Sequence, residues 1–223
     1  MGNIWFFEKV DLFDIFCPHK FAEFRGSHQF RSYGKGEFVY LPDDASDQVF
    51  LIADGKIRIL YYTESGEEVV RNILTKGEVF GELALLGQER RQDYAQAVRD
   101  GTTLCPLSLE QMVQLMKDDK PFALKVNKLI GLRIQRLERR LDALVFKDAR
   151  TRVIELIREL ATERGVHEGD RYRVEHSLTH KDIADLTGTS RQTVTTLLNE
   201  LRHEGMISID RKIIYIPDLK ILA

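Results

Sequence analysis

Residues 178–216 read LTHKDIADLTGTSRQTVTTLLNELRHEGMISIDRKIIYI, and this stretch decides the fold of the C-terminal part of the chain. Thr179 and Asp182 have the spacing of a capping box and predict a short helix over Lys181–Leu186. Ser190 is the N-cap of a second predicted helix. The apolar positions of that helix share one face: Val194, Leu197, Leu198 and Leu201. A glycine, Gly188, lies in the turn between the two helices, so the stretch predicts a helix-turn-helix.

A β-hairpin is predicted directly after the second helix. Residues 206–209 and 213–216 are short β-prone runs, and Asp210-Arg211-Lys212 between them has the polar character of a turn. A hairpin in this position is the wing of a winged helix-turn-helix. The alternative is an ordinary pair of helices with a solvated polar face.

The second helix presents a polar tip when its apolar face is turned inward. Arg191, Gln192, Thr195 and Thr196 then point outward near its N-terminal end, which is the end that enters the major groove of DNA. Arginine matches the edge of guanine there, and glutamine matches adenine. Hydroxyls at helix starts and nearby cations suit phosphate groups. The candidate phosphate contacts are Ser190, Thr193, Thr179, Lys181 and Arg211.

The sequence pattern from residue 30 to residue 107 is that of a β protein. Nine of the fifteen glycines fall between Gly26 and Gly101, and they separate short β-prone runs. Asp54-Gly55 lies between apolar runs at 49–52 and 57–60, which predicts a tight hairpin. Many short strands with tight turns indicate an antiparallel barrel, roll or sandwich.

A long helix is predicted after residue 109. Within it, seven positions alternate steps of four and three residues, the a/d spacing of a two-stranded coiled coil. These positions are Ala123, Asn127, Ile130, Ile134, Leu137, Leu141 and Leu144. We interpret them as a dimerisation seam between two copies of the chain. A single helix packed on its own domain is the alternative.

The overall composition is that of a soluble two-domain protein, and we expect it in the cytoplasm. The 223 residues carry a formal net charge of −2, and residues 148–223 hold 12 Lys/Arg against 13 Asp/Glu. The C-terminal part is therefore not basic as a whole, and we expect any DNA-binding surface to be a local basic patch. No apolar run reaches the ~18 residues that a membrane helix needs. Residues 4–25 predict one or two amphipathic helices.

Candidate metal and catalytic residues are sparse in the sequence. Two cysteines, Cys17 and Cys105, exclude an iron–sulfur cluster held by cysteines alone. A cupin-like metalloenzyme needs histidines inside its barrel, and none of the six histidines falls within residues 30–107. We therefore expect no enzyme, no catalytic residue and no metal site. Cys17 and His19 are the remaining candidates for a haem ligand.

The motifs of the C-terminal part resemble those of the Crp–Fnr family of transcription regulators. The segment Thr189-Ser190-Arg191-Gln192-Thr193-Val194 is similar to the family's recognition helix, and Met206-Ile207-Ser208 to its wing. The resemblance implies that Arg191 reads guanine. Cyclic-AMP-binding members commonly have Glu at the position of Gln192 and a second base-reading Arg at that of Thr196, so the target site differs from theirs.

The resemblance extends to the N-terminal part, where residues 47–55 and 76–83 look like the family's cyclic-nucleotide-binding β-roll. It implies an effector site at Gly81, Glu82 and Leu83, with a phosphate-clamping arginine that is either Arg90 or Arg91. Neither arginine is followed by the family's Ser or Thr. The adenine-contacting pair of the family falls on Leu137-Glu138, and these departures argue against a cyclic nucleotide. A different anionic effector is the alternative.

The fold class that follows is α+β: an N-terminal antiparallel, jelly-roll-like β-roll, a long dimerisation helix and a C-terminal winged helix-turn-helix. We assign the β-roll to residues 1–118, the helix and hinge to 119–147 and the DNA-binding domain to 148–223. The expected function is a homodimeric regulator that reads a palindromic site in double-stranded DNA. The family resemblance adds RNA polymerase as a partner. A nucleotide-sensing module without DNA contact is the alternative function.

Overall fold

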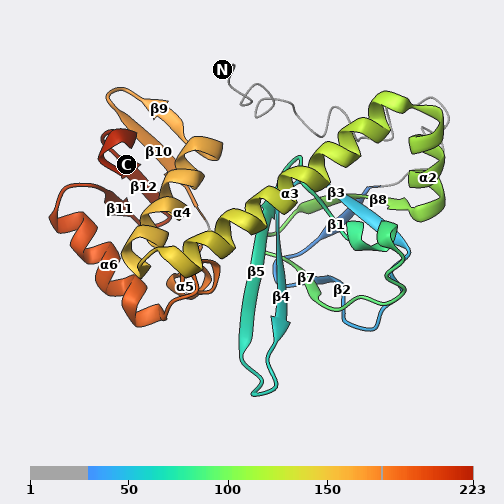
Figure 1. Cartoon of the computed structure of the whole chain (residues 1–223), viewed down its shortest axis with the longest axis horizontal. Coiled ribbons are helices and arrows are strands. Elements are labelled where there is room, and N and C mark those ends of the chain that lie inside the picture. Colours follow the sequence, from blue (N-terminus) through green and yellow to red (C-terminus); the bar gives the residue numbers. More distant parts are fainter. Residues whose placement is uncertain (1–29, 177, 223) are drawn as a thin grey trace. The chain divides into compact units, whose positions relative to one another are not determined.

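The computed structural model describes residues 30–176 and 178–222 (Figure 1). The predicted helices within residues 4–25 and the haem candidates Cys17 and His19 lie outside these residues. The chain forms two compact units that divide between Leu132 and Arg133, inside a long helix. The domain boundaries assigned from the sequence stay predictions. Within the described residues, no helix combines the length and the apolar character needed to span a membrane.

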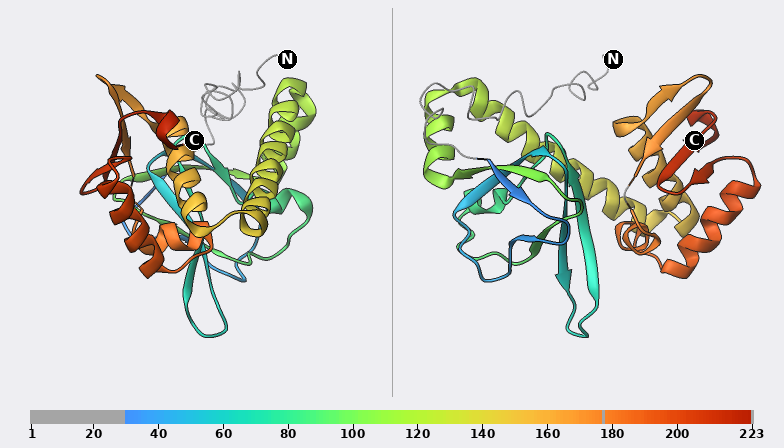
Figure 2. Two further views of the ribbon diagram at one scale, coloured as in Figure 1. Left: turned by 60° about the vertical axis from the view of Figure 1, so that its left-hand side comes forward. Right: turned by 180° about the vertical axis from the view of Figure 1, so that it is seen from behind.

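The first unit contains two four-stranded antiparallel sheets, with strand orders β1-β8-β3-β6 and β2-β7-β4-β5. The strands are β1 Arg31–Tyr33, β2 Phe38–Tyr40, β3 Gln48–Asp54, β4 Lys56–Tyr62, β5 Glu68–Thr75, β6 Val79–Phe80, β7 Tyr94–Ala97 and β8 Thr102–Ser108. A short 3-10 helix, η4 (Glu82–Leu86), follows β6. The β4–β5 hairpin extends beyond the rest of the unit (Figures 1 and 2). The predicted antiparallel fold of the N-terminal part is confirmed.

The predicted hairpin at Asp54-Gly55 is wrong. β3 pairs with β6 and β8, whereas β4 pairs with β5 and β7, so the chain passes at Gly55 from one sheet to the other. Gly55 has a φ of 104°, and a Cβ there would stand 2.5 Å from Oγ1 of Thr102. Glycine is thus required by the close approach of β8 rather than by a two-residue turn.

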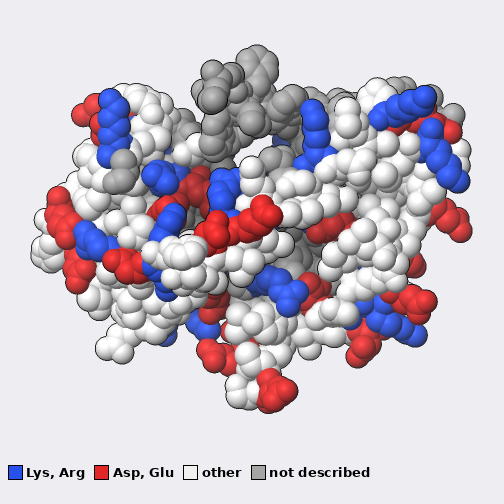
Figure 3. All heavy atoms as spheres, viewed as in Figure 1, with Lys and Arg blue, Asp and Glu red and all other residues white. Residues whose placement is uncertain are grey.

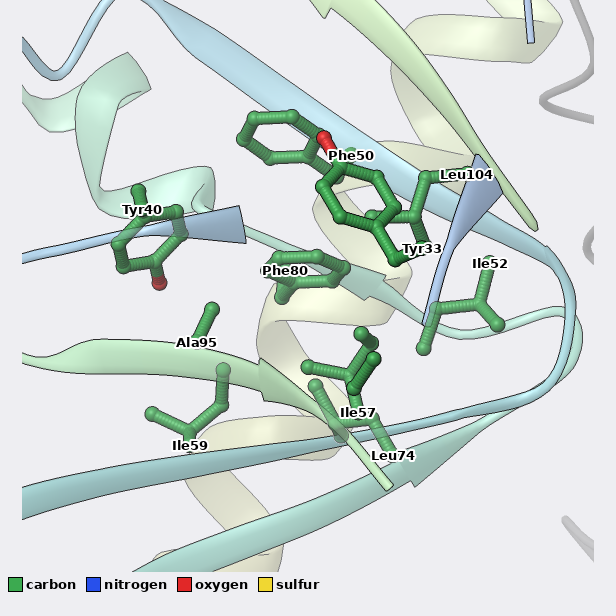
Figure 4. Close-up of a cluster of buried hydrophobic side chains, with 11 residues drawn as sticks. Tyr33, Tyr40, Phe50, Ile52, Ile57, Ile59, Leu74, Phe80, Ala95 and Leu104 are labelled. Carbon is green, nitrogen blue, oxygen red and sulfur yellow. The ribbon is translucent and has the colours of Figure 1, made fainter. Parts of the chain in front are cut away.

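The two sheets enclose an apolar core that is rich in aromatic rings (Figure 4). Phe50 and Phe80 stack with ring centroids 5.0 Å apart, and Tyr40 lies 6.1 Å from each of them. The outer face of β3 is buried as well, because the helices α2 (Leu109–Asp118) and α3 (Lys120–Phe146) cover it with Met112, Phe122 and other side chains. β3 is therefore apolar on both faces, which fixes it at the centre of the unit.

The second unit carries α4 (Ala149–Arg164), α5 (His180–Thr187) and α6 (Arg191–His203) beside a third antiparallel sheet of order β11-β12-β10-β9. The strands are β9 Val166–Glu168, β10 Arg171–Glu175, β11 Ser208–Asp210 and β12 Ile213–Ile216, and η5 (Leu219–Leu222) ends the described chain. β11 and β12 pair antiparallel as the predicted wing. The helix-turn-helix is confirmed, and α5 is one residue longer at each end than expected because His180 and Thr187 join it.

The turn between α5 and α6 has a left-handed backbone conformation at its centre. Gly188 has a φ of 61°, and a Cβ there would stand 2.5 Å from Cδ2 of Leu144. Its backbone N–H donates to the carbonyl of Ala184 and ends α5. The backbone conformation therefore favours glycine, while the end of the flexible Leu144 side chain could move away from an added Cβ.

Arg152 on α4 holds this turn in place. Its Nε donates to the carbonyl of Thr187 (2.7 Å), and Nη2 donates to that of Gly188 (3.1 Å). Nη1 donates to the carbonyl of Lys147 at the end of α3 (2.7 Å). One guanidinium thus satisfies carbonyls at two helix ends, where backbone oxygens lack partners inside the helix. The sequence analysis did not identify this residue.

The start of α4 is fixed by Asp148. The backbone N–H of Thr151 donates to its carboxylate (2.7 Å), and this bond lowers the pKa of Asp148. A carboxyl whose pKa is lowered by folding stabilises the fold at neutral pH and loses this contribution as the pH falls through the folded-state pKa. Asp148 is the N-cap of α4.

Arg152→Met should lower the free energy of unfolding by about 2 kcal/mol, because charge-assisted hydrogen bonds to the turn are lost while the aliphatic stem is kept. Denaturant unfolding followed by circular dichroism measures this. Arg158→Met on the same helix is the matched control, since Arg158 makes a single exposed ion pair of 3.7 Å with Glu155. Equal effects of the two substitutions would contradict the role assigned to Arg152.

Candidate nucleic-acid interface and effector site

One face of α6 is buried and the other is exposed at its N-terminal end. Val194 and Leu201 are fully buried and Leu198 nearly so, which anchors the helix in the second unit. Arg191 and Gln192 are exposed at the first turn. Thr196 is exposed and Thr195 is half-buried. The structure thus brings the four predicted base-reading residues together on one face.

The predicted phosphate contacts at the helix starts are engaged as caps. Oγ of Ser190 accepts from the backbone N–H of Thr193 (3.0 Å) and lies 2.8 Å from the Thr193 hydroxyl. Oγ1 of Thr179 accepts from the N–H of Asp182 (3.1 Å). The Asp182 carboxylate accepts in return from the N–H of Thr179 (2.7 Å). These hydroxyls fix where α5 and α6 begin.

The two predicted phosphate-binding cations lie on different elements. Lys181 lies on α5 and forms an ion pair of 2.7 Å with Asp185. Arg211 is exposed in the wing turn and has a φ of 52°, a left-handed conformation that is uncommon for a residue with a side chain. No contact between Arg211 and the start of α6 is observed among the described residues.

Other polar residues around α6 were not singled out from the sequence. Nδ1 of His180 lies 2.9 Å from Oγ1 of Thr195. Arg150 on α4 pairs with Glu200 (3.2 Å) and with Glu204 near the other end of α6. A groove of about 340 Å³ runs between the end of α6 and β11, and its lining residues are Asn199, Arg202, His203, Ile207, Ser208 and Ile209. These contacts join residues far apart in sequence, so no local pattern signals them.

The surface charges of both units are mixed. On the visible face, Lys and Arg alternate with Asp and Glu over each unit (Figure 3). This distribution agrees with the net charge of −2 and with the expectation that a DNA footprint is local.

In the first unit, Arg91 and Gly81 lie together. Arg91 is buried, and its Nη1 donates to the carbonyl of Gly81 (3.2 Å). Nη2 donates to the carbonyl of Gln48, and the guanidinium lies 4.5 Å from the centre of the Tyr40 ring. Gly81 has a φ of 78°, and a Cβ there would stand 2.9 Å from Nη1. The backbone of the turn at Gly81 thus packs directly against the guanidinium of Arg91.

The charge on Arg91 lacks a carboxylate partner. Within the described residues, no ion pair to Arg91 is present and its Nε has no hydrogen-bond partner. Burial lowers the pKa of Arg91, and nearby Tyr40 and more distant carboxylates raise it in part. A buried guanidinium without a counter-ion favours an anion that could approach it.

The other predicted effector residues are more open. Arg90 is exposed, and its Nη1 donates to the carbonyl of Asp43 (2.9 Å) in a different loop. Glu82 is half-buried and Leu83 is exposed, both on η4. Of the two candidate clamps, Arg91 is the one placed against Gly81.

The apolar residues of the predicted seam are more exposed in the later part of α3 than in the earlier part. Ile130 packs against the core of the first unit, and Ala123 is half-buried. Asn127 is exposed. The later apolar positions are 50–62% exposed, and these are Ile134, Leu137, Leu141 and Leu144. Outside the predicted seam, and among the side chains of this helix that the structure describes, Leu124, Val145 and Phe146 are exposed as well.

No group of three or more His, Cys, Asp or Glu side chains is placed to hold a metal ion in the part of the chain that the structure describes. Cys105 is a free thiol buried in the first unit.

Comparisons with known proteins identify the domain type of both parts of the chain. Residues 30–119 match the family model of the cyclic nucleotide-binding domain, and residues 151–223 match that of the Crp-like helix-turn-helix domain. The chain is 32% identical over 181 residues to the cyclic AMP receptor protein of Thermus thermophilus, covering 81% of this chain and 80% of that protein. It is 27% identical to a CRP-like cAMP-activated global transcriptional regulator of Mycobacterium tuberculosis, covering 86% and 85%.

The fold has close counterparts among solved structures. A mutant of CooA from Carboxydothermus hydrogenoformans superposes with a TM-score of 0.80 over 96% of this chain and 94% of that one, at 24% identity. The relatives are transcription regulators rather than enzymes. The chain therefore belongs to the Crp–Fnr family of DNA-binding transcription regulators.

Proposed function

We propose that the chain acts as a cytoplasmic homodimer that reads a palindromic DNA site with α6 and responds to an anionic effector in the β-roll. The observation that carries the proposal is the two-sided burial of α6. Its inner face is anchored by Val194, Leu198 and Leu201, while Arg191 and Gln192 stand exposed at its N-terminal turn. A rigid helix with a polar tip is the element that reads base edges in this class of motif.

In this proposal the base-reading residues are Arg191, Gln192, Thr195 and Thr196. Arg191 pairs with guanine through two hydrogen bonds, and Gln192 pairs with adenine. Phosphate contacts come from the second group of candidates: Ser190, Thr193, Thr179, Lys181 and Arg211. Ser190 and Thr179 cap α6 and α5, and the N-terminal end of a helix is a favourable place for a phosphate.

Dimerisation is proposed through the exposed part of α3. Ile134, Leu137 and Leu141 are each more than half exposed and follow the a/d spacing, so a second copy of the helix would remove them from water. Each such side chain contributes up to about 1.5–3 kcal/mol when fully buried. A two-fold protein matches a palindromic site, because each half-site then meets the same surface.

The effector site is proposed at Gly81 and Arg91, with Glu82 and Leu83 at its edge and Arg90 outside it. The buried guanidinium of Arg91 supplies positive charge, and the missing side chain at Gly81 lets that guanidinium lie against the backbone of the turn. Gln92 follows Arg91 where the nucleotide-binding relatives have a hydroxyl, so we propose an anion other than cyclic AMP. RNA polymerase is the proposed further partner, and no catalytic activity is proposed.

Arg191→Ala should relax selection at one symmetric G·C pair in each half-site and weaken binding to the preferred site, since a bidentate Arg–guanine pair is worth about 1–3 kcal/mol. Randomised-site selection with both proteins measures this. Arg211→Ala is the control, because losing a phosphate contact weakens all sequences alike. Identical motifs and stringency for wild type and Arg191→Ala would exclude Arg191 as a base reader.

Ile134→Lys combined with Leu141→Lys should convert the dimer to a monomer in sedimentation velocity, because two charges would enter the apolar seam. The matched control places lysines at the neighbouring exposed positions, Gln135→Lys with Asp142→Lys, and should remain dimeric. A dimer that survives the first pair would place the interface elsewhere.

Calorimetry with cyclic AMP should show no binding at micromolar concentrations. The hydroxyl that follows the phosphate-clamping arginine is absent, and Leu137-Glu138 stands where the relatives contact adenine.

Native mass spectrometry of the purified protein should instead reveal a retained anion, which is lost in Arg91→Gln and kept in Arg90→Gln. Tight binding of cyclic AMP would overturn the proposed effector class.

A further inference from the structure

His180 and Thr195 join the two helices of the helix-turn-helix beside the proposed base-reading residues. His180 is the exposed first residue of α5, and Thr195 lies one turn after Arg191 on α6. Nδ1 of the imidazole lies 2.9 Å from Oγ1 of Thr195. His180 is absent from the set of predicted DNA contacts, although it stands at their centre.

The hydrogen bonds of Thr195 determine which ring nitrogen carries the proton. Oγ1 of Thr195 donates to the backbone carbonyl of Arg191 (2.9 Å), and a carbonyl can only accept. The single hydroxyl proton is used in this bond. Toward His180 the oxygen therefore offers a lone pair, and Nδ1 must be the donor. In the neutral ring, Nε2 is then an acceptor without a proton.

In this tautomer a neutral His180 has no proton on Nε2 to donate to DNA phosphate, whose oxygens also only accept. The protonated ring can donate to phosphate, since its Nε2–H then forms a charge-assisted hydrogen bond while Nδ1–H still binds Thr195. We propose that His180 is a proton-dependent phosphate contact, so that binding of DNA takes up a proton at this ring. The inference rests on the proposed function, because it needs the start of α6 to lie in the major groove.

The carboxylates of α5 are already engaged within that helix. The Asp182 carboxylate accepts from the backbone N–H and the hydroxyl of Thr179 (2.7 and 2.8 Å). Asp185 is paired with Lys181 (2.7 Å). A phosphate of DNA is therefore the anion expected to meet Nε2–H in the complex.

The elements packed against α5 add no carboxylate at this end. α6 has no acidic residue in its first turn, and its charged residue there is the exposed Arg191. On α4, Arg152 binds carbonyls at the opposite end of α5. The first turn of α6 thus contributes a cation and no carboxylate, which suits a phosphate and not an internal ion pair.

The tautomer can be measured without DNA. Long-range ¹H–¹⁵N spectra of the full chain should show His180 with its proton on Nδ1 when the ring is neutral, and Thr195→Val should abolish this preference. A proton found on Nε2 in the wild type would overturn the argument.

The proton uptake is tested by fluorescence anisotropy with the selected operator and with a scrambled duplex at constant ionic strength. The wild type should bind both duplexes about tenfold more tightly at about pH 6 than at about pH 8, the range in which histidine changes charge. His180→Asn keeps a donor toward Thr195 but does not titrate, and should lose most of this pH dependence. His180→Arg carries a fixed charge and should bind tightly at both pH values.

His167→Asn, at an exposed histidine on β9, is the matched control and should keep the wild-type pH dependence. The dependence of log Kd on log salt should also be steeper by about 0.9 per protonated histidine at the lower pH. Equal pH dependence in the wild type and His180→Asn would refute the proposal while leaving the proposed function intact. Failure of the wild type to select any operator would instead refute the proposed function.

Discussion

The burial of one face of α6 is the constraint on which the DNA-reading part of the molecule depends. Val194, Leu198 and Leu201 are withdrawn from water, and this fixes both the position and the rotation of the helix. Gln192 lies on the opposite side of the helix from that face, and Arg191 is exposed because it occupies the first turn. The caps at Thr179 and Ser190 and the guanidinium of Arg152 then determine where the helices begin and how the turn between them is held.

The β-roll, in contrast to the DNA-reading part, buries a charged side chain in its apolar interior. Its interior contains the stacked rings of Phe50 and Phe80 with the tilted ring of Tyr40 beside them, and the charged side chain of Arg91 is buried against Tyr40 and Phe50. The backbone carbonyls of Gln48 and Gly81 satisfy its Nη donors but do not neutralise its charge. Packing alone would favour an apolar residue here. The buried arginine is therefore the observation on which the effector site proposed at this turn rests.

Much of the C-terminal unit could be predicted from sequence because its signals are local. A capping box, a glycine between two helices and a hairpin turn each act over a few residues, and the structure has each of them. The prediction at Gly55 failed because the same Asp-Gly pair serves a close approach to Thr102 on a strand nearly fifty residues away. Arg152 and His180 were missed for the same reason, since their partners lie on other helices. The choice between Arg90 and Arg91 also needed the fold, because adjacent residues of an extended segment point in opposite directions.

The left-handed backbone of Arg211 has a consequence for the balance between stability and function. A residue with a side chain in this conformation is disfavoured by about 1–2 kcal/mol, and glycine would relieve the strain. The wing turn nevertheless has an arginine at this position, exposed and cationic. The fold thus tolerates a strained residue at the tip of the wing, where a glycine would be more stable but carry no charge. Stabilising the wing by design and keeping its charge are therefore opposing aims at this position.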